Sequence, residues 1–138
     1  MVPDSLSKFV VERAIERCEY CLMHQSLQIA TFHIEHVIPR SRGGTDHIEN
    51  LALACPRCNL CKSNRIKMMD PGTGKSVDHF NSRTQTWTDH FEWTGAILVG
   101  RTEVGRITVL TLNLNATRRL AIREMEQHFG LFPPKMIE

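Results

Sequence analysis

The sequence predicts an α+β fold in which short strands and short helices are mixed along one chain of 138 residues. Hydrophobic residues make up 41% and charged residues 23%, which is typical of a globular domain. Stretches rich in β-branched residues alternate with stretches whose apolar residues recur at helical spacing. Because a chain of this length buries roughly two-thirds of its unfolded surface, we expect residues 1–138 to form a single domain.

The first half of the chain is expected to contain two helices and two strands. Asp4 or Ser5 can cap a helix whose apolar residues repeat every three to four positions. Pro39 ends a β-branched segment, and Pro56 suits the first turn of a helix, where its missing N–H costs nothing. The expected elements are a helix over residues 5–17, a strand over 29–38, a strand over 51–54 and a helix over about 56–65.

The second half is expected to begin with a turn-rich linker over residues 70–74. Two apolar runs flanking Thr94-Gly95, residues 90–93 and 96–99, are typical of a β-hairpin. Thr102 is expected to cap a helix with Ile107, Leu110 and Leu114 on one stripe. A last helix over about 116–128 should end at Gly130.

Four of the five cysteines have metal-ligand spacing. Cys18-x-x-Cys21 and Cys55-Pro-Arg-Cys58 are two pairs that together complete a tetrahedral all-sulfur site. The pattern predicts a structural zinc ion, since four thiolates leave no position for water. The alternative is two pairs of buried or redox-active thiols. Cys61, one helical turn beyond Cys58, is expected to be a buried thiol and not a ligand.

The 33 residues between Cys21 and Cys55 must form a folded insertion, and they carry much of the chemistry. Phosphodiester hydrolysis needs a group that activates water, a cation near the leaving oxygen and groups that neutralise phosphate. A neutral imidazole suits the first role. A carboxylate and an amide oxygen suit a hard Mg²⁺-like ion, and residues of all these types occur in the predicted strand–loop–strand–helix unit.

These residues resemble the HNH endonuclease family, whose ββα-metal finger commonly sits on a four-cysteine zinc scaffold. The resemblance covers residues 18–64, and a weaker one to the extension of some bacterial HNH proteins reaches most of the remaining chain. Its motifs are Glu35-His36-Val-Ile-Pro-Arg-Ser-Arg-Gly-Gly44, Glu49-Asn50-Leu51 and Cys55-x-x-Cys58-Asn59-x-x-Lys62.

The resemblance implies a zinc-stapled, treble-clef-like finger with an N-terminal helix and a C-terminal hairpin plus helices. It divides the domain into a zinc-bound catalytic core over residues 18–65 and an extension over 66–138. The implied activity is hydrolysis of phosphodiester bonds in nucleic acid, with DNA as the expected substrate and Mg²⁺ or Mn²⁺ as the catalytic ion.

Carried over position by position, the resemblance assigns roles to four residues. His36 would be the general base, and Glu35 the acidic ligand of the divalent ion. Asn50 would fasten the loop and hold His36 in orientation. Asn59 would be the second ligand, which makes this a His-Asn-Asn variant. Because adjacent side chains on a strand point to opposite faces, Glu35 and His36 can share one phosphate only where the strand bends or ends.

Basic residues flank the proposed site and are candidates for phosphate contacts, with a solvated surface as the alternative for each. The net charge of the chain, +2, is too small to indicate a nucleic-acid partner by itself. The candidates are Arg40, Arg42, Arg57, Lys62 and Arg65.

The sequence leaves two other functions open. A catalytically inactive, zinc-containing nucleic-acid-binding module would need the cysteines but not Glu35, His36, Asn50 and Asn59. A redox or metal-sensing protein would use reactive thiols. A cytoplasmic location is expected, because the first residues lack a secretory pattern and no apolar run approaches the ~20 residues of a membrane span.

Overall fold

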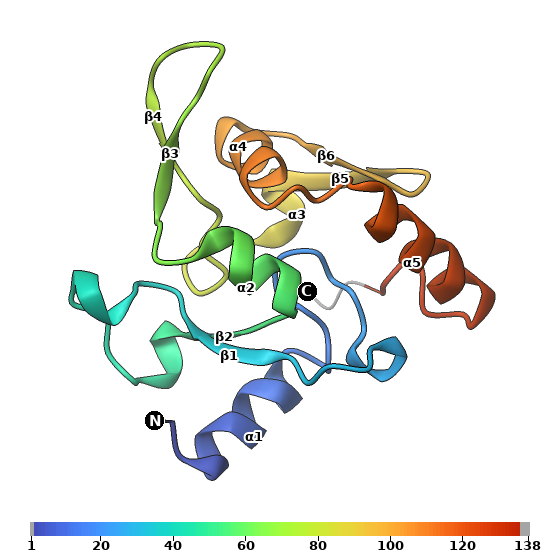
Figure 1. Ribbon diagram of the computed structural model, residues 1–138, viewed down its shortest axis with the longest axis horizontal. Coiled ribbons are helices and arrows are strands. Elements are labelled where there is room, and N and C mark those ends of the chain that lie inside the picture. Colours follow the sequence, from blue (N-terminus) through green and yellow to red (C-terminus); the bar gives the residue numbers. More distant parts are fainter. Residues whose placement is uncertain (1, 136–138) are drawn as a thin grey trace.

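The computed structural model describes residues 2–135 and has a mixed helix–strand architecture (Figure 1). This confirms the expected α+β composition. In the described part, three separate two-stranded antiparallel sheets form. The elements are α1 (Asp4–Arg13), β1 (His33–His36), β2 (Leu51–Ala54), α2 (Pro56–Lys62), β3 (Lys67–Met69), β4 (Ser76–Asp78), α3 (Trp87–His90), β5 (Phe91–Thr94), β6 (Ile97–Gly100), α4 (Glu103–Thr111) and α5 (Thr117–His128).

The β1–β2 hairpin lies between α1 and α2 (Figure 1). Strand β2 occupies the residues that the sequence predicts, and all four are buried. Strand β1 is shorter than the expected 29–38, since it pairs only from His33, opposite Ala54, to His36, opposite Leu51. The four residues of β2 offer no partner for an earlier start, and Ile29 is fully exposed.

Helix α1 ends at Arg13 instead of continuing to residue 17. Ile15 and Glu16 adopt positive φ values, which turn the chain back toward the protein. The expected cap is also wrong: Pro3 holds the N-cap position, without a side-chain hydrogen bond. Asp4 lies in the first turn, where its negative charge interacts favourably with the positive end of the helix dipole.

Helix α2 begins at Pro56 as predicted but ends at Lys62, because Ser63 has a φ of 52°. The chain then enters the β3–β4 hairpin, which projects from the rest of the molecule (Figure 1). The residues predicted as a linker, 70–74, are the turn of this hairpin. The Asp70 carboxylate accepts a bond from the Gly72 N–H at 2.8 Å.

The C-terminal elements agree closely with the sequence. Thr102 Oγ1 accepts a hydrogen bond from Gly105 N at 3.0 Å and caps α4 as predicted. The β5–β6 turn falls at Gly95-Ala96, one residue later than expected, because Thr94 pairs with Ile97. Leu110, expected on the apolar stripe of α4, is exposed. Helix α5 occupies the expected range and is followed by Gly130 at positive φ.

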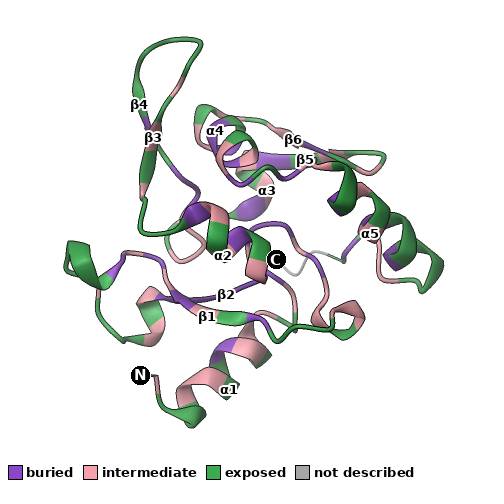
Figure 2. Cartoon of the chain, viewed as in Figure 1, coloured by how far each residue is buried: buried purple, intermediate pink, exposed green. Residues whose placement is uncertain are grey.

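One hydrophobic cluster contains residues from both halves of the chain. Phe80 packs edge-on against Tyr20 and Phe91, with ring centroids 6.5 Å and 5.3 Å apart. The buried segments of β2, α3 and β5 face this cluster, and the β3–β4 hairpin is mostly exposed (Figure 2). Within residues 2–135, none of the helices combines the length and the apolar character that crossing a membrane requires.

Candidate functional site

The four paired cysteines meet in one buried cluster. The Sγ atoms of Cys18, Cys21, Cys55 and Cys58 all lie within 4.8 Å of one another, and none forms a disulfide. Four sulfurs around a zinc ion at Zn–S ≈ 2.3 Å would be about 3.8 Å apart, and the Sγ atoms of Cys21 and Cys55 are 3.8 Å apart. The cluster can therefore hold a metal ion such as zinc. Cys61 is half-buried and lies outside it.

Local backbone geometry positions both cysteine pairs. Cys18 O accepts a bond from Leu22 N at 2.9 Å, and Leu22 has a φ of 61°, so the first pair sits on a tight turn. Cys55 is the N-cap of α2, and its sulfur accepts from Cys58 N at 3.4 Å. Each pair therefore places both sulfurs on one side of a turn.

A surface cleft of about 430 Å³ brings together three of the four residues assigned to catalysis. Glu35 and His36 come from β1, and Asn59 from α2, which packs against β1. Strand β1 ends at His36. The end of a strand is one of the two places, with a bend, where Glu35 and His36 were expected to be able to share one phosphate. The lining residues are Val2, Ile34, Glu35, His36, Pro39, Arg40, Asn59, Ser63 and Asn64.

His36 has a carboxylate partner. Its Nε2 lies 2.7 Å from Oδ1 of Asp46, and the guanidinium of Arg40 donates to the same oxygen at 2.8 and 3.1 Å. The hydrogen bonds from His36 and then from Arg40 hold the pKa of the Asp46 carboxyl below its usual range. Sequence reasoning gave Asp46 no role, because nothing in the local pattern links it to a residue ten positions earlier.

Glu35 points into the protein and is only 5% exposed. Tyr20 donates its hydroxyl to Glu35, and Lys62 Nζ lies 3.6 Å from its Oε2. Burial raises the pKa of the Glu35 carboxyl, and the charge of Lys62 and the Tyr20 hydrogen bond oppose this rise without cancelling it. Glu35 therefore lines the cleft as a residue, while its carboxylate is held by two buried partners.

Asn50 fastens the loop that follows β1. Its Oδ1 accepts from Ile38 N at 2.8 Å, and its Nδ2 donates to the carbonyl oxygens of Ile38 and Thr45 at 3.0 and 2.8 Å. Each of these bonds joins Asn50 to the backbone. Within residues 2–135, the Asn50 side chain acts on the chain next to His36 and makes no bond to the imidazole.

A comparison with protein families identifies the segment that carries this site. Residues 18–65 match the family model described as HNH endonuclease. The matched segment, called the HNH segment below, contains both cysteine pairs, β1, β2 and α2. The match supports a nuclease-type function and a nucleic-acid substrate. No curated protein and no solved structure matches the chain.

Within the HNH segment, Lys62 does not lie where a phosphate contact requires it. It is 2% exposed, and its ammonium donates to the carbonyl of Val37 at 3.1 Å. Its side chain packs inward, next to Glu35. The four arginines proposed for phosphate contacts, Arg40, Arg42, Arg57 and Arg65, are exposed.

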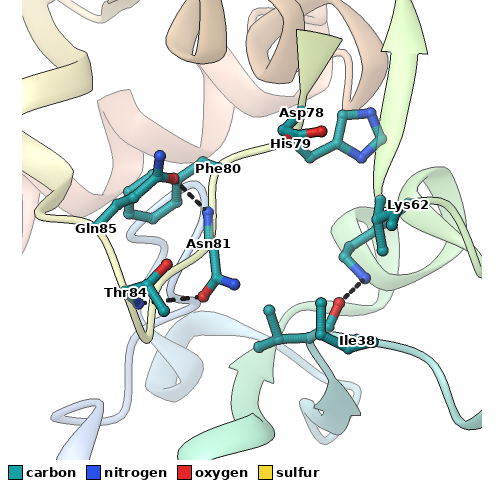
Figure 3. A pocket seen from close by; sticks show the side chains of 10 residues that line it. Ile38, Lys62, Asp78, His79, Phe80, Asn81, Thr84 and Gln85 are labelled. Carbon is teal, nitrogen blue, oxygen red and sulfur yellow. Dashed lines mark hydrogen bonds between the residues drawn. The ribbon is translucent and has the colours of Figure 1, made fainter. Parts of the chain in front are cut away.

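A second cavity, of about 180 Å³, lies beside Lys62 (Figure 3). Asn81, Thr84 and Gln85 line it on the side away from the HNH segment, and His79 borders it close to Lys62. His79 is buried, and no described residue gives its ring nitrogens a well-formed hydrogen bond. Burial, followed by the charges of Lys62 and Arg65, lowers its pKa to about 4. His79 is therefore neutral at pH 7.

Proposed function

We propose that the protein is a metal-dependent endonuclease that hydrolyses phosphodiester bonds of DNA, with its active site in the cleft of the HNH segment. One observation carries the proposal: His36, Glu35 and Asn59 line a single open cleft. An imidazole can act as the base that activates water, and a carboxylate with an amide can hold the divalent ion that assists phosphodiester hydrolysis.

His36 is the general base. Asp46 accepts a hydrogen bond from the Nε2–H, which fixes the tautomer and leaves the Nδ1 lone pair for the proton of water. Arg40 keeps Asp46 in place through two bonds to the same oxygen. The water that loses its proton to His36 attacks phosphorus in line with the departing 3′-oxygen. Asn50 maintains this arrangement through the backbone of residues 38 and 45.

Glu35 and Asn59 are the ligands of the catalytic ion, Mg²⁺ or Mn²⁺, in a His-Asn-Asn site. Their donor atoms are a carboxylate and an amide oxygen, which such hard ions prefer. When bound, the ion would supply positive charge that stabilises the departing oxygen. Tyr20 and Lys62 hold the Glu35 carboxylate in place.

The chain is one domain, residues 1–138, in which a structural zinc ion holds the core 18–65. The described residues of the extension 66–138 pack against this core. The exposed arginines contact the phosphate backbone. If all four bind, the logarithm of DNA affinity falls with the logarithm of salt concentration with a slope of about −3 to −4. This set is Arg40, Arg42, Arg57 and Arg65.

A catalytically inactive, zinc-containing nucleic-acid-binding module is the second candidate, and one observation favours it. The Glu35 carboxylate is already engaged by Tyr20 and Lys62 in a buried position. An ion must compete with the ammonium of Lys62 for this carboxylate. In an inactive module, Lys62 would remain paired with the Glu35 carboxylate and no ion would bind there.

The two candidates are separated by incubating zinc-loaded protein with supercoiled plasmid, with and without Mg²⁺ or Mn²⁺. We expect metal-dependent nicking, and a His36→Ala rate lower by about 10²–10⁴-fold with unchanged zinc content. His33→Ala is the matched control, because His33 is an exposed histidine of the same strand. A fully active His36→Ala protein refutes the mechanism. DNA binding without cleavage under any of these conditions favours the inactive module.

Asp46→Ala tests the orientation of the base. We expect slower cleavage with little change in DNA affinity, and partial recovery in Asp46→Asn, which retains an acceptor oxygen. Glu49→Gln, which removes an exposed charge close by in the chain, should cleave like the wild type. Equal rates for Asp46→Ala and Glu49→Gln would remove Asp46 from the mechanism and leave the assignment of His36 intact.

A further inference from the structure

Helix α5 places an arginine directly on the cysteine cluster. Arg119 is 3% exposed, and its Nη1 lies 3.4 Å from the sulfur of Cys58 and 3.8 Å from that of Cys55. Its Nη2 donates to the carbonyl of Leu112 at 2.9 Å. The side chain thus joins the two sulfurs at the start of α2 to the chain segment between α4 and α5.

The charge of Arg119 matches a metal-bound cluster. When four thiols bind one divalent ion they release four protons, and the resulting complex carries a charge of −2. A guanidinium that donates to such thiolates forms charge-assisted N–H···S bonds. Beside four neutral thiols, the same buried cation would lack a counter-charge, which is unfavourable. The position of Arg119 therefore suits the tetrathiolate form.

The other buried cation of α5 has different partners. Arg123 donates to the carbonyl oxygens of Leu114 and Ala96 at 2.5 and 2.8 Å, and its guanidinium lies 4.9 Å from the ring centre of Trp93. Glu126, also buried on α5, accepts a bond from His24 N at 2.7 Å. Of the two buried arginines of α5, Arg119 is the one that contacts sulfur.

We propose that Arg119 is part of the metal site, as an outer cation that stabilises the thiolates of Cys55 and Cys58 and fastens α5 to the metal-loaded cluster. The ligand is a thiophilic divalent ion such as Zn²⁺. In this arrangement the metal ion holds the C-terminal extension as well as the two cysteine turns, since loss of the thiolate charge removes the partner of Arg119.

The test compares zinc release from Arg119→Met and Arg118→Met proteins to an excess of a chromogenic chelator. Arg118 is the matched control, because it is the preceding residue of α5 and is exposed. Partners of metal ligands typically contribute 10–100-fold to metal affinity, so Arg119→Met should bind zinc about 10–100-fold more weakly. Arg118→Met should match the wild type. Neither measurement depends on nuclease activity.

Cobalt substitution and hydrogen exchange provide independent readouts. Loss of the N–H···S bonds should move the sulfur-to-cobalt charge-transfer band to lower energy in Arg119→Met. Removing zinc from the wild type should expose the amides of α5 to exchange. If Arg119→Met fails to fold, Arg119→Lys serves instead. One ammonium cannot replace both guanidinium contacts, so zinc release from Arg119→Lys should lie between that of the wild type and that expected without a cation at this position. Wild-type zinc affinity together with an unshifted cobalt spectrum in the tested variant overturns the proposal.

Discussion

Replacing Lys62 with methionine tests whether this residue stabilises the fold or contacts nucleic acid. Methionine fills most of the same volume but removes the ammonium. Two buried groups then lose their partner: the Glu35 carboxylate, 3.6 Å from Lys62 Nζ, and the Val37 carbonyl, which accepts from it at 3.1 Å. We therefore expect Lys62→Met to destabilise the protein strongly.

Removing one partner of a buried ion pair destabilises a protein by about 3–5 kcal/mol. The Tyr20 hydroxyl continues to donate to Glu35, which places the expected loss near the lower end, at about 3 kcal/mol. For a domain of this size, such a loss lowers the melting temperature by about 10 °C. The effect should also depend on pH, because protonation of Glu35 relieves the unpaired charge.

The direction of the pH dependence follows from the pKa of Glu35. Burial raises this pKa and the Lys62 charge opposes the rise, so removing Lys62 raises it further. A carboxyl with a raised pKa in the folded state loses stability as the pH rises through that pKa. The difference between Lys62→Met and the wild type should therefore be larger at pH 8 than at pH 5.

Urea unfolding of zinc-loaded protein, followed by tryptophan fluorescence at both pH values, measures these changes. Lys67→Met is the matched control, because Lys67 is an exposed lysine of β3. The double variant Lys62→Met/Glu35→Gln should recover part of the lost stability, since it removes the unpaired charge. Lys62→Met as stable as Lys67→Met, but with weaker DNA binding, would refute our reasoning and restore the phosphate contact that the sequence suggests.

Three further outcomes are expected. A Cβ at Gly44 would lie 1.6 Å from the carbonyl oxygen of Ile38, so Gly44→Ala should cost about 3 kcal/mol in urea unfolding. Gly43→Ala, which meets no atom within 4 Å but has a φ of 87°, should cost about 1 kcal/mol; equal losses would contradict the overlap. The wild type should lose stability as the pH falls from about 6.5 to about 4, because in this range His79 binds a proton in the unfolded protein but not in the folded protein. His79→Gln should weaken this dependence of stability on pH. An unchanged dependence would show that other groups cause it. Chelation of the metal should make the four clustered cysteines reactive toward a thiol reagent and lower the helical circular dichroism, whereas equal thiol reactivity before and after chelation would argue against a bound metal.

The elements that the sequence predicts best are set by short-range rules. Pro56 at the first turn of α2 and Thr102 as the cap of α4 act within one helical turn, and both lie where expected. The cysteine pairs follow the same logic, since each spacing is a property of one turn. The β3–β4 hairpin was missed because its strands have three residues each, too few for an alternating pattern.

The contacts that complete the site connect residues far apart in the sequence. Asp46 contacts His36 across a loop. Lys62 turns inward because its ammonium pairs with the Glu35 carboxylate and donates a hydrogen bond to the Val37 carbonyl. A lysine in a basic segment resembles a surface residue until the fold supplies a buried acid beside it. Arg119 approaches the sulfurs from α5, 61 residues after Cys58, at a separation where local patterns carry no information.

The hydrophobic cluster shared by both halves of the chain limits how the HNH segment can be transplanted. Trp87 donates its indole N–H to the Tyr20 carbonyl at 3.0 Å, and Phe80 covers the edge of the Tyr20 ring. A graft containing only residues 18–65 would expose this tyrosine, whose hydroxyl holds Glu35. A chimaeric protein built from this scaffold should therefore retain Phe80 and Trp87 along with the HNH segment.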